Sequence, residues 1–144
     1  MSAQEDDVIR SILATPRTVA VIGWSPNPAR ASHYVAAFLA EKLGMRVLPV
    51  NPGQAGQDYG VEKVAAGLAD LADGDQVEML DIFRRSDAVG EIVDEALQVL
   101  PNLKFIWMQL GVTDEAAARR AREKGIVVIQ NRCPKIEAAR LALV

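Results

Sequence analysis

The sequence predicts an α/β protein built on a doubly wound parallel sheet of about five strands, a three-layer Rossmann-like fold with helices on both faces of the sheet. Three observations lead to this class. Short β-branched segments alternate along the chain with segments of helical period. The strand-like segments are apolar at nearly every position, as expected for parallel strands that are covered on both sides. Glycine or Asn-Pro turns separate these segments.

The elements are expected to alternate after an opening helix. Apolar runs that end at turn residues predict five strands, over residues 18–23, 45–50, 76–83, 104–108 and 126–129. Helical periodicity predicts helices over residues 6–14, 31–43, 88–100, 114–124 and 136–143. Residues 54–74 give a weaker signal, for a loop and one short helix over 65–71. Because parallel crossovers are right-handed, few strand orders remain, and we expect the order 3-2-1-4-5.

Length and composition limit the classes of protein to consider. We expect one domain over residues 1–144, with a helical segment over 1–16 and the core over 17–144. The formal net charge of −3 argues against nonspecific nucleic-acid binding, which requires clustered positive charge. The N-terminal residues do not resemble a signal peptide, and no apolar run approaches the roughly 20 residues that cross a bilayer. We therefore expect a cytoplasmic protein without membrane association.

The turn after the first strand carries the strongest functional signal. Ligands of doubly wound sheets bind at the carboxyl ends of the strands, where the strand order reverses. Gly23 permits a tight turn and a close approach of the backbone, and Ser25 adds a hydroxyl. Ser32 is expected to cap the next helix, whose N-terminus attracts anions, and Arg30 adds a full positive charge. These residues predict a phosphate site; the alternative is a plain strand-to-helix turn with no ligand.

The same turn departs from the dinucleotide-binding fingerprint. Ser25 stands where the second glycine of that pattern belongs, and Pro28 stands where the third belongs. The second strand ends at Asn51 and Pro52, without the acidic residue that holds the ribose of NAD. Ordinary NAD recognition is therefore disfavoured, and another nucleotide cofactor is expected.

Five motifs run in order through the chain after residue 17. They are VAVIGWSPNPARASHYVAAFL (19–39), VLPVNP (47–52), DIFRR (81–85), IWMQLGV (106–112) and NRCPKIE (131–137). With these motifs the chain resembles the small stand-alone CoA-binding proteins, which are related to the CoA-binding domains of succinyl-CoA synthetase and of NDP-forming acyl-CoA synthetases. Trp24 is a departure, because that family more often has a small or aliphatic residue at this position.

The resemblance implies that coenzyme A, or an acyl-CoA, binds in a cleft at the strand ends. It implies that the pyrophosphate lies along Gly23, Trp24, Ser25, Arg30 and Ser32. The adenosine end would be flanked by Asn51 and Pro52, and the cleft after the third strand by Phe83 and Arg84. The pantetheine side would be bordered by Trp107, Gln109 and Gly111, and the cleft would be closed by Asn131, Arg132 and Cys133.

Basic residues in the predicted strand-end loops agree with a ligand that carries several phosphates. These residues are Arg30, Arg84, Arg85, Arg132 and Lys135. An arginine can hold a phosphate with two parallel hydrogen bonds. The alternative for Arg84 and Arg85 is that both simply face solvent at the start of a helix.

The sequence offers little for catalysis. His33 could act as a general base and Cys133 as a nucleophile, but a packed helical residue and a buried structural thiol are the expected roles. As the only histidine and the only cysteine, they also exclude a zinc cage and an internal disulfide. Asp81 and Glu137 are expected to be structural carboxylates, with Asp81 bonded to loop N–H groups or paired with an arginine such as Arg84 or Arg132.

The expected function is therefore binding of CoA or acyl-CoA, non-catalytic or regulatory, rather than the work of a complete ligase. The alternatives are a small NAD(P)-dependent oxidoreductase and a transferase acting on a CoA thioester. An apolar patch on the last helix would suit a homodimer, through Ile136, Leu141, Leu143 and Val144. An unidentified protein partner is the other open alternative.

Overall fold

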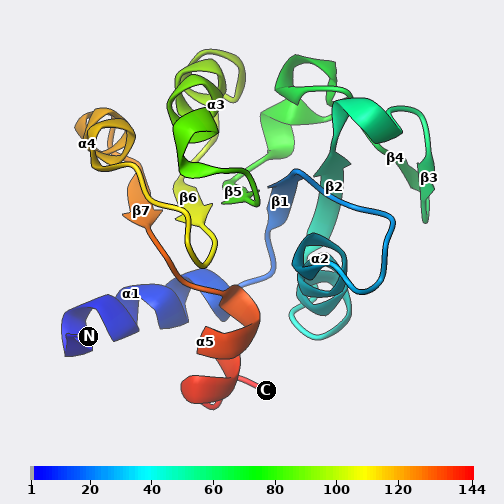
Figure 1. Ribbon diagram of the computed structural model, residues 1–144. Helices are drawn as coiled ribbons and strands as arrows, with labels where there is room; N and C mark the ends of the chain where they lie inside the picture. The colour runs from blue at the N-terminus through cyan, green and yellow to red at the C-terminus, as the bar shows by residue number, and fades with distance from the viewer. Residues whose placement is uncertain (1) are drawn as a thin grey trace.

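A computed structural model describes residues 2–144 and contains one five-stranded parallel sheet. Residue 1, which the expected domain includes, lies outside the described residues. The strands are β1 (Thr18–Ile22), β2 (Arg46–Val50), β5 (Met79–Ile82), β6 (Phe105–Met108) and β7 (Val127–Ile129). All four strand pairs are parallel, and the order across the sheet is β2-β1-β5-β6-β7 (Figure 1). The α/β class, the parallel sheet and the number of strands are confirmed.

The strand order corrects one expectation. Counted along the chain, the five strands lie in the order 2-1-3-4-5, so the third strand pairs with β1 and does not lie beyond β2. The outer edge of β2 is already covered by the segment that follows it. Val50 bridges to Ala65, and the Ala65 N–H donates to the Pro49 carbonyl at 3.0 Å. This cover leaves β5 to pair with the other edge of β1, where the winding of the chain reverses.

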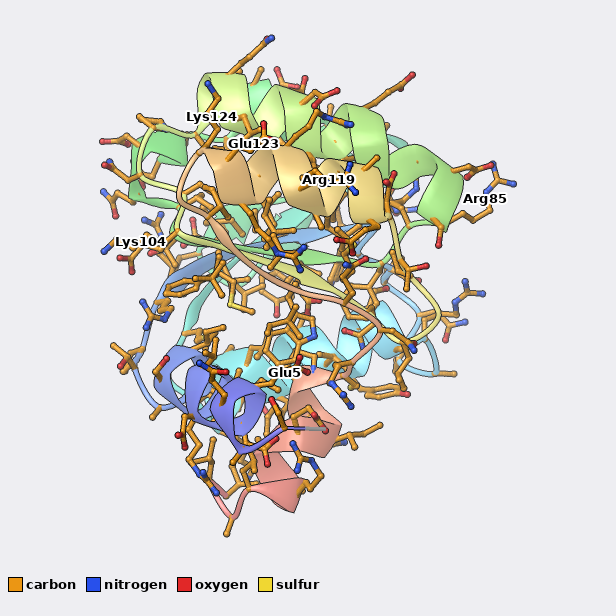
Figure 2. All side chains as sticks on the ribbon, turned by 90° about the vertical axis from the view of Figure 1, so that its left-hand side faces the viewer. Glu5, Arg85, Lys104, Arg119, Glu123 and Lys124 are labelled. Atoms are coloured by element: carbon orange, nitrogen blue, oxygen red, sulfur yellow. The ribbon has the colours of Figure 1, made fainter. Side chains whose placement is uncertain are left out.

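Helices cover both faces of the sheet, which gives three layers (Figures 1 and 2). One layer contains α1 (Ala3–Leu13), α2 (Ala31–Glu41) and α5 (Pro134–Arg140). The other contains α3 (Ser86–Val99) and α4 (Glu115–Glu123). Successive strand residues point to opposite faces, so Val19 and Val21 pack in the α1–α2–α5 layer while Ala20 and Ile22 pack in the α3–α4 layer.

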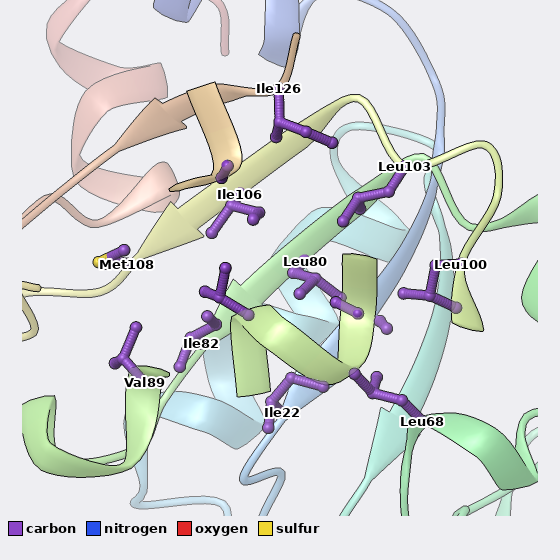
Figure 3. Close-up of a cluster of buried hydrophobic side chains, with 14 of the residues drawn as sticks. Ile22, Leu68, Leu80, Ile82, Val89, Leu100, Leu103, Ile106, Met108 and Ile126 are labelled. Atoms are coloured by element: carbon purple, nitrogen blue, oxygen red, sulfur yellow. The ribbon is translucent and has the colours of Figure 1, made fainter. Parts of the chain in front are cut away.

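The α3–α4 side of the sheet is the larger apolar core (Figure 3). Ile22, Leu80, Ile82 and Ile106 come from three adjacent strands and are all buried there. Leu100, which follows α3, closes the same core. Burial of these side chains is the main contribution to the stability of the fold, and it keeps the neighbouring strands in register.

The segment between β2 and β5 differs most from expectation. It contains the turns η1 (Pro52–Gln54), η2 (Leu68–Asp70) and η3 (Gly74–Gln76) and a hairpin of β3 (Asp58–Tyr59) with β4 (Glu62–Lys63). The helix expected over 65–71 is reduced to the single turn η2, and the hairpin was not expected. Arg46 on β2 holds this segment, because it forms ion pairs with Glu62 at 2.8 Å and with Asp73 at 2.7 Å.

Within residues 2–144, every helix is too short or too polar to span a bilayer. No group of three or more His, Cys, Asp or Glu side chains in this part of the chain could hold a metal ion.

Candidate functional site

The candidate site lies where β1 and β5 end side by side, at the reversal of the winding. Gly23 follows β1 with φ of +85°, and a Cβ at this position would lie 2.7 Å from the Phe83 carbonyl oxygen. Only glycine fits this conformation at this separation. The N–H groups of Gly23 and Trp24 donate to the Val50 carbonyl at 2.9 and 3.2 Å, so they hold the turn onto β2.

Side chains from three elements fix the path of the loop after Gly23. Asn51 Nδ2 donates to the Trp24 carbonyl at 2.7 Å, and His33 Nδ1 bonds to the Ser25 carbonyl at 2.9 Å. The Asn27 N–H donates to Ser25 Oγ at 3.1 Å. The Ser25 hydroxyl and the Asn51 amide therefore already have partners within the loop, and His33 on α2 is a positioning residue for it.

Trp24 is buried beneath the loop. Its side chain is 2% exposed and packs edge-on against Tyr59 of the hairpin, with 5.4 Å between ring centroids. Its indole Nε1 is buried without a hydrogen-bond partner. The indole thus belongs to the core on the α2 side, which explains how the chain accommodates a large residue at this position.

The start of α2 corrects the expected capping residue. Arg30 is the N-cap, without a side-chain capping bond, and Ser32 is buried inside the first turn. The chain turns earlier than expected because the Ala29 N–H donates to Asn27 Oδ1 and the Arg30 N–H donates to the Asn27 carbonyl. Arg30 itself is exposed to solvent near this helix end.

A cleft of about 680 Å³ opens at the ends of β5 and β6. Phe83, Arg84 and Gln109 line it from the loops after these strands. Cys133 and Lys135 line it from the start of α5. The cleft therefore brings together four predicted site residues from distant parts of the sequence, together with Lys135.

A smaller cavity of about 150 Å³ lies beside the ends of β1 and β2. Gly23, Pro52 and Gly67 line it, and so does Arg84, which also lines the larger cleft. The Arg84 side chain passes over the turn, since its Cδ lies 3.1 Å from the position of a Cβ on Gly23. Arg84 thus stands between the two cavities as an exposed cation.

Other predicted residues support the cleft without lining it. Asn131, at φ 58°, accepts a hydrogen bond at Oδ1 from the Gly111 N–H at 2.7 Å, which holds the loop after β6. Trp107 is fully buried, and its Nε1 donates to the Arg132 carbonyl at 2.8 Å. The Arg132 side chain turns toward α1, where its Nε pairs with Glu5 at 3.1 Å.

Two buried polar side chains lack partners near the strand ends. Both carboxyl oxygens of Asp81 are buried without hydrogen bonds, which contradicts the expected pairing with Arg84, Arg132 or loop N–H groups. Burial raises the pKa of Asp81 well above its ordinary value, so the carboxyl is neutral over a wider pH range. Gln109, 5% exposed, lines the larger cleft, and its Oε1 also has no partner. A ligand that donates a hydrogen bond would satisfy that oxygen.

Glu137 is the other carboxylate that the sequence singled out. It is buried on α5 and forms ion pairs with Arg140 at 3.2 Å and with Arg132 at 3.6 Å. These contacts give it the expected structural role, as a link between α5 and the residues that face α1.

Several cleft residues were not predicted as site residues. Tyr34 lines the cleft from α2, and Leu110 and Val112 line it from the loop after β6. Ile136, expected in a dimer patch, lines it from α5, whereas Leu141 and Leu143 of that patch pack against the α1–α2–α5 core. The sequence signal for Tyr34 and Ile136 was an apolar residue outside the buried face of its helix. Such a residue does not by itself indicate a site.

The sequence of this chain was compared with known protein families. Residues 17–139 match the family described as CoA binding domain. The chain belongs to this family. The resemblance indicated by the five sequence motifs is thereby confirmed, and the matched region contains every residue of both cavities.

Proteins of similar size resemble this chain over almost their whole length. The uncharacterized protein YneT of Bacillus subtilis (strain 168) is 32% identical over 131 residues, which cover 91% of this chain and 92% of that protein. The solved structure of cell-free ID.343 from Thermus thermophilus is 34% identical, with a TM-score of 0.81, and the match covers 98% of this chain and 99% of that one.

A larger enzyme contains a domain of the same fold. The match to the dinucleotide forming acetyl-coenzyme A synthetase 1 of Ca. Korarchaeum cryptofilum covers 85% of this chain and 27% of the synthetase chain. The TM-score is 0.63 and the sequence identity is 24%. At this identity the likeness concerns the fold alone. It agrees with the relation to acyl-CoA synthetases that the sequence motifs imply.

Proposed function

We propose that this protein binds coenzyme A or an acyl-CoA across the two cavities at the strand ends, in a binding or regulatory role without a covalent step. The observation that carries the proposal is the position of Arg84. It lines both cavities, lies over Gly23 and forms no ion pair within residues 2–144. A free arginine at the strand switch point is the group expected to meet the pyrophosphate between the two halves of CoA.

The two cavities suggest how the ligand would lie. The adenosine end would occupy the smaller cavity beside Pro52 and Gly67. The pyrophosphate would lie near Arg84 and the start of α2, where the helix N-terminus favours an anion. The pantetheine arm would then follow the larger cleft past Phe83 to Gln109.

Gln109 supports this direction for the pantetheine arm. Its buried Oε1 needs a donor, and the pantetheine arm carries amide N–H groups. Arg85 and Lys135 also line the larger cleft and add positive charge around a ligand with several phosphates. The family membership of the chain supports the same ligand.

Isothermal titration with CoA, 3′-dephospho-CoA and NAD tests the proposal. We expect CoA to bind at submillimolar concentration and NAD to bind much more weakly. Arg84→Gln should weaken CoA binding about tenfold to a hundredfold, because a hydrogen bond to a charged group contributes about 1.5–3 kcal/mol. Arg119→Gln is the matched control, since Arg119 lies exposed on α4 (Figure 2), and α4 lines neither cavity.

Two results would contradict the proposed function. One is the absence of heat with CoA at submillimolar concentration, given a folded protein by circular dichroism. The other is equal weakening of CoA binding by Arg84→Gln and by Arg119→Gln, because that would trace the effect to net charge and not to the site.

A further inference from the structure

Three exposed apolar side chains surround the larger cleft. Tyr34 is 43% exposed, Leu110 is 55% exposed and Ile136 is 53% exposed, and all three line the cleft. They are half of the exposed large apolar residues among residues 2–144. Single exposed apolar residues are ordinary, but a group around one cleft marks a surface that binds something.

This apolar rim comes from three separate elements. Tyr34 belongs to α2, Ile136 belongs to α5, and Leu110 follows β6. The Lys135 ammonium lies 5.1 Å from the centre of the Tyr34 ring, which joins the α2 and α5 walls. Val112, from the loop that carries Leu110, continues the apolar wall.

Charged and polar groups share the cleft with this rim. Arg84 lines both the cleft and the smaller cavity, so it marks the side where the two meet. Gln109 precedes Leu110 in the chain and also lines the cleft. The cleft therefore combines a cation on the side of the smaller cavity with exposed apolar side chains from α2, from α5 and from the loop after β6.

We infer that the apolar rim holds the acyl chain of an acyl-CoA, so that the protein prefers a short or medium-chain acyl-CoA to free CoA. This inference rests on the proposed function. With the pyrophosphate at Arg84 and the pantetheine arm in the larger cleft, the exposed side chains that line this cleft, Tyr34, Leu110 and Ile136, would cover the acyl chain. Free CoA would leave these side chains in water, whereas an acyl chain covers them.

The shape and charge of the cleft favour this occupant over a second copy of the chain. A protein interface of ordinary size is apolar at its centre and buries about 800 Å² on each partner. Here the three exposed apolar side chains line a cleft of about 680 Å³ that also contains the Arg84 cation. A narrow ligand with an anionic part and an apolar end meets that combination.

The experiment is isothermal titration with CoA, acetyl-CoA, butanoyl-CoA, hexanoyl-CoA and octanoyl-CoA. We expect affinity to rise with chain length, by about fourfold for each methylene that the rim covers, and then to level off. Ile136→Ser and Leu110→Ser should each lower the ratio of octanoyl-CoA affinity to CoA affinity by at least about threefold.

Val61→Ser is the matched control. Val61 is 98% exposed, lies in the turn of the β3–β4 hairpin and lines a different cavity. The substitution removes the same kind of exposed apolar side chain, so it should leave every affinity and the ratio unchanged. Thermal unfolding of all three variants checks that they are folded, because surface substitutions rarely change stability by more than about 0.5 kcal/mol.

Each remaining outcome has one meaning. Equal affinities for CoA and octanoyl-CoA overturn the acyl-chain inference and leave CoA binding intact. No binding of any of the five ligands overturns the proposed function. A dimer by sedimentation equilibrium that Ile136→Ser converts to a monomer, with an unchanged affinity ratio, assigns the rim to a second copy and also overturns the inference.

Discussion

Gly23 meets two constraints at once, one from its own backbone and one from a neighbouring strand. Its φ of +85° strains any L-residue, and its Cα faces the Phe83 carbonyl so closely that a Cβ would lie 2.7 Å from the oxygen. The oxygen belongs to the backbone at the end of β5 and cannot move without shifting that strand. The close approach therefore ties the turn after β1 to the end of β5.

Gly23→Ala is expected to destabilise the protein more than Gly56→Ala. Gly56 has φ of +87° with nothing within 4 Å of its Cβ position, so its substitution adds backbone strain alone, about 1 kcal/mol. Gly23→Ala should add about 1–3 kcal/mol more from overpacking. Urea denaturation measures both free energies of unfolding. Equal losses for the two variants would show that β1 and β5 yield without cost.

The side chain of Gln109 illustrates how burial and function are linked at a single residue. A buried acceptor without a partner costs free energy in the folded protein. Under the proposed function, a ligand N–H group that reached this oxygen would recover the cost on binding and would favour ligands with a donor at that point. The position of Gln109 in the sequence, directly after an apolar strand, did not indicate that its side-chain oxygen would lack a partner.

At the scale of elements, Arg46 connects the central sheet to the least regular part of the chain. Its guanidinium donates from Nε and Nη2 to the two carboxylate oxygens of Glu62 on β4, at 2.8 and 3.1 Å. Nη2 also donates to Asp73 at 2.7 Å, just before η3. The paired geometry keeps the hairpin against the edge of β2, which is the edge that β5 would otherwise have been free to occupy.

Arg46→Met is expected to loosen the hairpin and the turns that follow it. The loss of both ion pairs should lower the free energy of unfolding by about 1–2 kcal/mol, between the values for exposed and buried pairs. Hydrogen exchange should quicken at the backbone amides of residues 57–73. Arg10→Met is the control, because the Arg10–Asp7 pair is exposed and lies within α1. Unchanged exchange in residues 57–73 would contradict this role of Arg46.

At the scale of the whole molecule, ion pairs join α1 to α5 and to Arg132, which precedes α5, within one helix layer, next to the candidate site. Arg140 of α5 pairs with Asp6 of α1 at 2.7 Å and with Glu137 at 3.2 Å. Arg132 pairs with Glu5, which lies on α1 (Figure 2). These contacts place α1 behind α5 and so support the wall of the cleft that Cys133 and Lys135 provide.

Asp81 makes the stability of the whole fold depend on pH. Burial raises the pKa of Asp81 in the folded state above the ordinary value of 3.8. Between these two pKa values the folded state binds a proton that the unfolded state has released. The stability that depends on this proton is complete below pH 3.8 and is lost as the pH rises toward the folded-state pKa, by about 1.4 kcal/mol per pH unit.

Asp81→Asn should remove this dependence. The asparagine does not titrate, so the variant should gain stability relative to the unmodified protein as the pH rises from 3.8 toward the raised folded-state pKa of Asp81. Urea denaturation at several pH values measures the difference, in which the contributions of other titrating groups cancel. Parallel stability curves for the two proteins would contradict the raised pKa.

The class of the fold, the kinds of elements and their order along the chain could all be predicted from the amino-acid sequence. Apolar periodicity and turn residues are local signals, and they located every strand of the main sheet and the glycine turn after the first. Five short motifs then indicated the family that the comparison with known families supports. Some element ends differ from the predicted ones. For example, β5 begins at Met79 and not at residue 76, because residues 74–76 form the turn η3.

The strand order, the partners of the charged residues and the shape of the cleft became clear only from the three-dimensional structure. β5 pairs with β1 because Ala65 covers the free edge of β2, and Arg132 turns away from the cleft because Glu5 on α1 attracts it. Both outcomes depend on contacts between residues far apart in the chain. Such contacts leave no periodic pattern, so local sequence rules cannot predict them, and the apolar rim of the cleft was hidden for the same reason.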